Sequence, residues 1–237
     1  MINFYAAVSG RVLIGSWEHL LPIVFALIVS VFLIRYARTL SSKAQYRLIH
    51  FIAVFISVTV IVFHIYNSIY SDYNFRVDLP LYLCSLLGIL IPIYTYYKKY
   101  WMFEILIFWI IAGTLQGVIT PDIAEGAPSF DYFRYWIVHL GLLLVIFYSI
   151  FVFKLKPKFK SIFKSFFALQ LYVLLMIALN FILDANYFYL NEKPKSASVL
   201  DYFGDWPNYI IVCQLLIIPL FMIIYLPFYV HKQSLRK

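Results

Sequence analysis

The chain has 237 residues, of which 64% are hydrophobic and only 13% are charged. Soluble domains are roughly half apolar and about a quarter charged, so this composition excludes a soluble globular protein and predicts a polytopic membrane protein. The formal net charge of +8 would suit nucleic-acid binding, but the positions of the charges argue against that function. The two cysteines are too few for a disulfide framework.

Seven stretches of the chain are long and apolar enough to cross a bilayer, which takes about 20 residues per helix. The sequence therefore predicts an all-α bundle of seven transmembrane helices in one membrane domain, residues 1–237. A short amphipathic segment, 1–16, is expected before the bundle, and a basic tail, 231–237, after it. The predicted spans are Trp17–Tyr36, Leu48–Tyr70, Leu79–Tyr97, Trp101–Ile119, Tyr135–Phe153, Phe166–Leu183 and Asn208–Val230.

The basic residues alternate between the two sides of the predicted bundle. Most of the 19 Lys and Arg residues lie in the first, third and fifth connections and in the tail. Short loops rich in Lys and Arg stay in the cytoplasm, so the N-terminus is predicted outside and the C-terminus inside. Short basic loops held at a bilayer favour anionic lipid heads over nucleic acid. Membrane lipids are thus the expected partners, nucleic acid is not, and the sequence leaves protein partners unknown.

Polar side chains gather in the half of the predicted spans that faces outside, whereas the other half is nearly all apolar. Polar groups inside a membrane are costly and often functional, so the pattern predicts an outward-facing polar pocket. Asp184 and Asn186 also have the spacing of a helix cap and turn. The candidate pocket residues are Glu18, His19, His64, Asn67, Gln116, Asn180, Asp184, Asn186 and Gln214.

Cys84 and His139 are the candidates for catalysis. At about 1.5 Å per residue, Cys84 lies about 7 Å below Leu79, and His139 lies about 7 Å below Arg134. A histidine at the same depth as a thiol could act as its general base. The alternatives are a cysteine that packs as a small hydrophobic residue and a histidine that makes an interhelical hydrogen bond. Cys213 has a similar depth in the seventh predicted span but has no polar flanking motif.

Two further sequence patterns concern a possible metal site and the packing of the fourth predicted span. His19, His64 and His139 could form a zinc site, but no HxxxH or HExxH spacing is present, so neither a metal nor a cofactor is expected. Gly113 and Gly117 share a helical face with Gln116, which favours close helix packing. Gln116 could also donate a hydrogen bond to an oxyanion.

Four segments resemble the YwaF-like bacterial integral membrane family: WEHLLP from Trp17, LPLYLCS from Leu79, ITPD from Ile119 and NYFYL from Asn186. The resemblance extends from about Trp17 to Pro227. That family is similar to eukaryotic membrane proteins implicated in cysteine-dependent phospholipid acyl transfer. The resemblance implies a multi-pass protein of the bacterial plasma membrane, with Cys84 as nucleophile and His139 as base.

The sequence thus favours a membrane-embedded lipid acyltransferase or thiol-dependent lipid hydrolase that works through Cys84 and His139. The alternative is a transporter or ligand-binding membrane protein that uses the same pocket, with Glu18 and His139 carrying protons. An odd number of spans and the absence of a visible repeat argue against transport. A scaffold that organises partners through its aromatic surface is a third option.

Overall fold

The computed structural model describes residues 10–234, and the regular structure in this range is entirely helical. Six helices are long and apolar enough to cross a membrane, and a seventh apolar helix is shorter. This confirms the predicted all-α membrane bundle. The long helices are α1 (Trp17–Ala37), α2 (Ser42–Tyr70), a composite helix of α4 (Tyr100–Trp109), η1 (Ile110–Thr114) and α5 (Leu115–Ile119), α6 (Phe130–Phe151), α7 (Phe159–Leu183) and α8 (Asn208–Ser234); the shorter one is α3 (Leu83–Tyr97).

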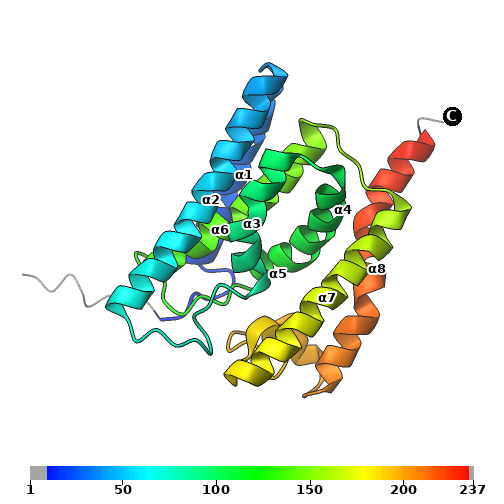
Figure 1. Ribbon diagram of the computed structural model, residues 1–237. Helices are drawn as coiled ribbons and strands as arrows, with labels where there is room; N and C mark the ends of the chain where they lie inside the picture. Colours follow the sequence, from blue (N-terminus) through cyan, green and yellow to red (C-terminus); the bar gives the residue numbers. More distant parts are fainter. Residues whose placement is uncertain (1–9, 235–237) are drawn as a thin grey trace, which may run out of the picture.

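Helix α6 occupies the centre of the bundle and contacts α1, α2, α3 and the composite helix. Figure 1 shows α3 and α6 between the α1–α2 pair on one side and the α7–α8 pair on the other. The buried face of α6 includes Trp136, Leu142 and Tyr148. Its central position explains why the polar residues His139 and Ser149 of this helix are buried.

The outer helices expose large apolar side chains that water would not tolerate. Phe181 is 89% exposed and Ile182 is 73% exposed at one end of α7, and Leu215 on α8 is 71% exposed. Continuous apolar surfaces of this kind mark contact with lipid rather than water. The surface of the bundle therefore agrees with its composition, and the protein is a multi-pass membrane protein.

The third predicted span is wrong at its start. Residues Leu79 to Tyr82 form a turn, and α3 begins only at Leu83. The turn is held from outside: the Leu79 N–H donates to the Tyr187 hydroxyl at 3.0 Å, and the Leu81 carbonyl accepts from the Tyr172 hydroxyl at 2.6 Å. Cys84 is therefore the second residue of the helix, and its predicted depth, counted as helix from Leu79, does not hold.

Other boundaries also move. Helix α6 begins at Phe130 rather than Tyr135, so Arg134 lies inside it, and α7 begins at Phe159 rather than Phe166. The predicted fourth span is interrupted by the π-helical segment Ile110–Thr114. The part of the predicted N-terminal segment that is described, residues 10–16, is not helical, and residues 1–9 lie outside the described range. Helix α8 continues into the predicted tail, of which 235–237 are not described.

The long connection between α7 and α8 folds back onto the bundle, as its aromatic content suggested. It contains two short 3₁₀ segments, η2 (Tyr187–Tyr189) and η3 (Val199–Phe203). Tyr187 is fully buried, and its hydroxyl donates to the Phe75 carbonyl at 2.6 Å. Burial raises the pKa of Tyr187 to about 12, so the phenol remains a hydrogen-bond donor at neutral pH. This connection therefore covers one end of the bundle.

Candidate functional site

Cys84 is half-buried in the first turn of α3. The first hydrogen bond at this end of the helix runs from the Leu86 N–H to the Tyr82 carbonyl at 2.9 Å. The N–H groups of Leu83, Cys84 and Ser85 consequently have no acceptor within the helix, and the N-cap residue Tyr82 provides no side-chain acceptor. Such a helix start favours negative charge on nearby atoms. The thiol thus lies beside backbone donors suited to an anion.

His139 lies on α6 and is buried. Its Nδ1 is 2.8 Å from the Tyr135 carbonyl oxygen. A carbonyl can only accept a hydrogen bond, so Nδ1 carries the proton and Nε2 keeps its lone pair. The Tyr135 ring stacks on the imidazole with a centroid separation of 3.9 Å. The imidazole is thereby fixed in orientation, with Nε2 as its proton acceptor.

The composite helix brings Cys84 and His139 to a common surface. The Cys84 Sγ is 3.5 Å from the Thr114 Oγ1, and Thr114 is completely buried. One helical turn further, the imidazole edge covers Gly117: a Cβ placed there would be 2.9 Å from His139 Nε2. Among the described residues no hydrogen bond joins the thiol to the imidazole. Both groups instead border the turn Thr114–Gly117.

The π-helical segment Ile110–Thr114 sets this arrangement. A π-turn inserts one residue into a helix and rotates everything that follows, and such insertions are frequent at functional sites. Here the segment ends at Thr114, the residue that contacts the thiol. Tyr135 fastens the next turn, since its hydroxyl donates to the Gly117 carbonyl at 2.7 Å.

Glu18 and His19 attach the start of α1 to neighbouring segments through hydrogen bonds. The Gly15 N–H donates to His19 Nδ1 at 2.9 Å, so the opposite nitrogen, Nε2, donates to the Val118 carbonyl at 2.8 Å. Glu18 accepts the Ala127 N–H at 2.9 Å. Both ring nitrogens of His19 are thus bound to backbone, and both residues attach α1 to the ends of α5 and α6.

The polar residues at the end of α7 organise the chain that follows them. Asn180 donates to the Tyr187 carbonyl at 2.9 Å and accepts the Tyr187 N–H at 2.7 Å. Asp184 is the C-cap of α7 in a left-handed conformation, and it pairs with Arg76 at 3.0 Å. Asn186 accepts the Asn191 N–H at 2.9 Å. These contacts match the cap-and-turn interpretation.

The remaining candidates do not gather around Cys84. Gln116 lies on the turn between Thr114 and Gly117, but its amide donates to Thr120 at 3.0 Å. His64 has Nδ1 3.4 Å from the Tyr73 hydroxyl, whereas its buried Nε2 has no hydrogen-bond partner within residues 10–234. Asn67 and Gln214 are half-buried on α2 and α8. Cys84 and His139 therefore lie against the composite helix, which also carries Gln116. The other candidates lie in separate hydrogen-bond networks or away from this helix.

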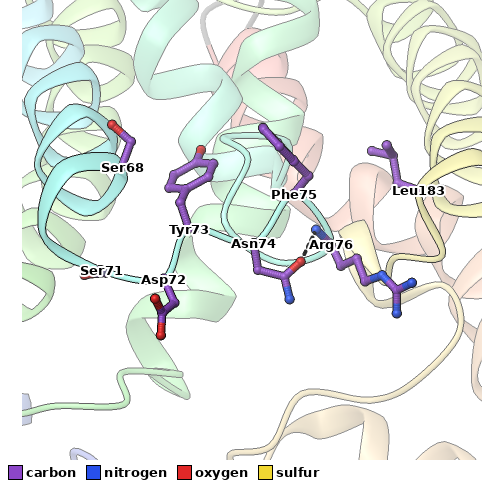
Figure 2. A pocket seen from close by; sticks show the side chains of 8 residues that line it. All are labelled: Ser68, Ser71, Asp72, Tyr73, Asn74, Phe75, Arg76 and Leu183. Carbon is purple, nitrogen blue, oxygen red and sulfur yellow. Dashed lines mark hydrogen bonds between the residues drawn. The ribbon is translucent and has the colours of Figure 1, made fainter.

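A shallow groove of about 750 Å³ lies where the α2–α3 connection meets the end of α7 (Figure 2). Arg76 and Asn74 border it, and the Arg76 N–H donates to the Asn74 side chain at 2.9 Å. Tyr73 rises from the same connection, next to His64 on α2. The lining residues are Ser68, Ser71, Asp72, Tyr73, Asn74, Phe75, Arg76 and Leu183.

Sequence reasoning missed Asp122, which joins three separate parts of the chain. Its carboxylate pairs with Arg11 and accepts the Ser196 hydroxyl at 2.8 Å and the Tyr189 hydroxyl at 3.1 Å. Thr114 and Tyr135 were missed as well. The sequence contains a signal for Tyr135, because this residue precedes His139 by one helical turn. It contains none for Thr114, because a π-turn does not change the hydropathy pattern.

A family comparison decides where the chain belongs. Residues 14–225 match the model of the TMEM164 family. The chain belongs to the TMEM164 family. The match covers almost all of the described helices and agrees with a membrane-protein family, but it does not support the YwaF-like or the bacterial assignment. Searches of curated proteins and of solved structures found no match to this TMEM164-family chain. Within residues 10–234 no three His, Cys, Asp or Glu side chains are grouped to hold a metal ion.

Proposed function

We propose that this TMEM164-family protein is a membrane-embedded lipid acyltransferase or thiol-dependent lipid hydrolase, with Cys84 as nucleophile and His139 as general base. One observation carries the proposal. A thiol in the uncapped first turn of α3 and an imidazole whose Nε2 is its proton acceptor border the same helical turn, Thr114–Gly117. The resemblance to cysteine-dependent acyl-transfer proteins points in the same direction.

The chemistry starts with proton transfer from the Cys84 thiol to His139 Nε2. Catalytic hydrogen bonds are often long or unformed without substrate, so the separate bonds of the two groups are compatible with this step. The thiolate attacks the carbonyl carbon of a lipid ester; a C–S bond forms and the ester C–O bond breaks. The lysolipid oxygen leaves with the proton held by His139. An acceptor hydroxyl, or water, then gives its proton to His139 and attacks the thioester, which restores the thiol.

The oxyanion that forms in each step needs hydrogen-bond donors. The N–H groups of Leu83, Cys84 and Ser85, which have no acceptor within α3, are the preferred donors because they are fixed by the helix and cost no reorganisation. The Thr114 hydroxyl is a further donor beside the sulfur. Gln116 is a weaker choice and Asn180 weaker still, since both atoms of the Asn180 amide already bond the Tyr187 backbone.

The end of the bundle that carries Cys84 is proposed to face outside. Most Lys and Arg residues of the described range lie at the opposite end, in the connections that follow α1, α3 and α6 and in the adjoining turns of the helices, which the positive-inside rule places in the cytoplasm. In this orientation the groove of Figure 2, with Arg76 on its border, lies at headgroup level on the substrate side. The transport alternative needs Glu18 and His139 as proton carriers, and it has less support because the Glu18 carboxylate accepts the Ala127 N–H at 2.9 Å.

The test is to trap the acyl-enzyme. The full chain is purified, reconstituted with phospholipid carrying a labelled acyl chain, and analysed by peptide mass spectrometry before and after hydroxylamine, which cleaves thioesters. We expect hydroxylamine-sensitive acyl label on the Cys84 peptide. Transfer to a lysophospholipid acceptor should fall by about 100-fold or more in Cys84→Ala and His139→Ala.

Cys213 supplies the matched control, since it is the other cysteine of the chain and is also half-buried. Cys213→Ala should retain full acyl transfer. If Cys84→Ala retains activity, or if Cys213 acquires as much label as Cys84, the proposed mechanism is wrong.

A further inference from the structure

A second pocket lies at the opposite end of the bundle, where four segments meet. It has a volume of about 720 Å³, within the range of small-molecule sites. Arg38 follows α1, Gln45 lies in the first turns of α2, and His231 is on α8 near its end. The α6–α7 connection contributes Val152, Lys154 and Lys156 to the lining, and Figure 1 shows this connection running from the end of α6 to the start of α7. Its lining, called the basic pocket below, is Arg38, Gln45, Ile150, Phe151, Val152, Lys154, Lys156 and His231.

The charge of the basic pocket is unbalanced. Arg38, Lys154 and Lys156 are cations at neutral pH, and none of the lining residues is acidic. The carboxylate of Glu104, which lies at this end of the bundle, is bound to Lys164 and accepts the Ser161 hydroxyl at 2.7 Å. In the described range no ion pair engages the Lys154 or Lys156 ammonium. The pocket therefore holds positive charge that no acidic side chain of residues 10–234 neutralises in an ion pair.

The basic side chains are carried by an anchored backbone rather than a loose loop. Arg38 donates from Nε to the Phe151 carbonyl at 3.1 Å, which fixes its guanidinium while the terminal nitrogens have no bond within residues 10–234. The Tyr100 hydroxyl donates to the Lys156 carbonyl at 2.7 Å. Lys154 adopts φ 57°, a left-handed conformation that is rare for a residue with a side chain. The Leu155 N–H donates to the Ser149 carbonyl at 3.1 Å across this residue, so the left-handed conformation ends α6 and fixes the backbone that carries Lys154 and Lys156.

The arrangement of the basic side chains indicates the class of ligand. The free edge of a guanidinium binds two oxygens of a phosphate at once, and lysine adds point charge. Ile150, Phe151 and Val152 provide an apolar side to the same pocket, and Phe151 is 47% exposed. The pocket lies at the ends of membrane-spanning helices, the level of lipid phosphates. We infer that the basic pocket binds the phosphate of an anionic phospholipid headgroup, with its chains along the adjacent apolar helix surface. This site is remote from Cys84 and does not depend on the proposed acyl transfer.

The experiment uses the full chain in neutral detergent and native mass spectrometry to count retained lipids. Dioleoylphosphatidylglycerol is the probe and dioleoylphosphatidylcholine the comparison. We expect preferential retention of phosphatidylglycerol by the natural chain. The double variant Lys154→Gln/Lys156→Gln should lose at least about tenfold in affinity, because each basic residue near an anionic headgroup contributes about 1 kcal/mol.

The matched control is Lys160→Gln/Lys232→Gln, which removes the same charge from exposed positions outside the pocket. It should remain within about threefold of the natural chain. Arg38→Lys keeps the charge but removes the two-pronged geometry, so an intermediate loss is expected. Unchanged elution and thermal unfolding establish that the variants fold.

Three results would overturn the inference. Equal losses in both double variants would mean general attraction of lipid to a basic surface. Equal retention of the two lipids would remove the charge preference. Displacement of phosphatidylglycerol by glycerol 3-phosphate or inorganic phosphate at equal affinity would assign the pocket to a soluble phosphate compound instead of a lipid.

Discussion

The imidazole of His139 rests directly on Gly117, so close that a methyl group at that position would be 2.8 Å from Cδ2 and 2.9 Å from Nε2. The contact combines two sequence observations that seemed unrelated, a small residue on one helix and a polar residue on another. Gly117 is small because the histidine occupies the space of its side chain. The position of Nε2 is therefore determined by the composite helix as well as by α6.

Replacing Gly117 with alanine should displace His139 Nε2 from its position. Misplacement of a catalytic group by about 1 Å can cost about 100-fold in rate, so acyl transfer by Gly117→Ala should fall at least about tenfold. Overpacking should also destabilise the protein by about 1–3 kcal/mol. The matched change is Gly113→Ala, whose new methyl would meet only the end of the flexible Leu83 side chain at 3.3 Å. Initial rates in proteoliposomes check the pair; equal rates would show that the contact with His139 is unimportant.

His19 should behave as a structural histidine. His19→Leu leaves the Val118 carbonyl and the Gly15 N–H without their partners, which costs about 1–3 kcal/mol for each buried group. His64→Leu is the control, because His64 makes one hydrogen bond of 3.4 Å and its buried Nε2 has no partner in the described part of the chain. Thermal unfolding in detergent should show a clearly lower midpoint for His19→Leu only. A larger effect of His64→Leu would contradict the assignment.

Asp122 should hold the α7–α8 connection and the segment before α1 together. Asp122→Ala removes the acceptor of Arg11, Ser196 and Tyr189 at once, and hydrogen bonds to charged groups contribute about 1.5–3 kcal/mol. We expect amide hydrogen exchange in residues 186–207 to accelerate at least about tenfold while α6 stays protected. Asp205→Ala, which loses only an exposed contact with Lys193, should leave exchange nearly unchanged. Uniform acceleration throughout the bundle would instead indicate global destabilisation.

Alkaline pH should loosen the α7–α8 connection through Tyr187. Burial raises the pKa of Tyr187 to about 12 in the folded protein, against about 10 in an unfolded chain. The folded state therefore holds its proton more tightly, so this contribution to stability is complete below about pH 10 and is lost as pH rises toward 12. Hydrogen exchange corrected for the intrinsic pH effect should show protection of residues 186–190 falling in that window. Tyr187→Phe should weaken protection at neutral pH and remove part of this dependence.

The structure shows why helix rotation and helix starts were harder to predict than helix identity. Hydropathy is a sum over about 20 residues and tolerates errors at single positions, so every predicted span corresponds to an apolar helix. The start of α3 depends instead on the Tyr172 and Tyr187 hydroxyls, which hold Leu79 and Leu81 from far along the chain. The depth of Cys84 was misjudged for that reason.

The chain by itself determined that this is a helical membrane protein with basic residues concentrated at one end, because burial in lipid and charge at its edges act on each segment separately. Only the tertiary structure decided which polar side chains hold segments together through hydrogen bonds and which border the proposed catalytic site. Asn180 bonds to the backbone of the connection that follows its helix, and His19 bonds to the backbone at the end of α5, whereas the thiol of Cys84 and Nε2 of His139 lie on either side of one turn. Those pairings depend on how helices rotate and where a π-turn is inserted, which the spacing of residues along a single helix does not contain.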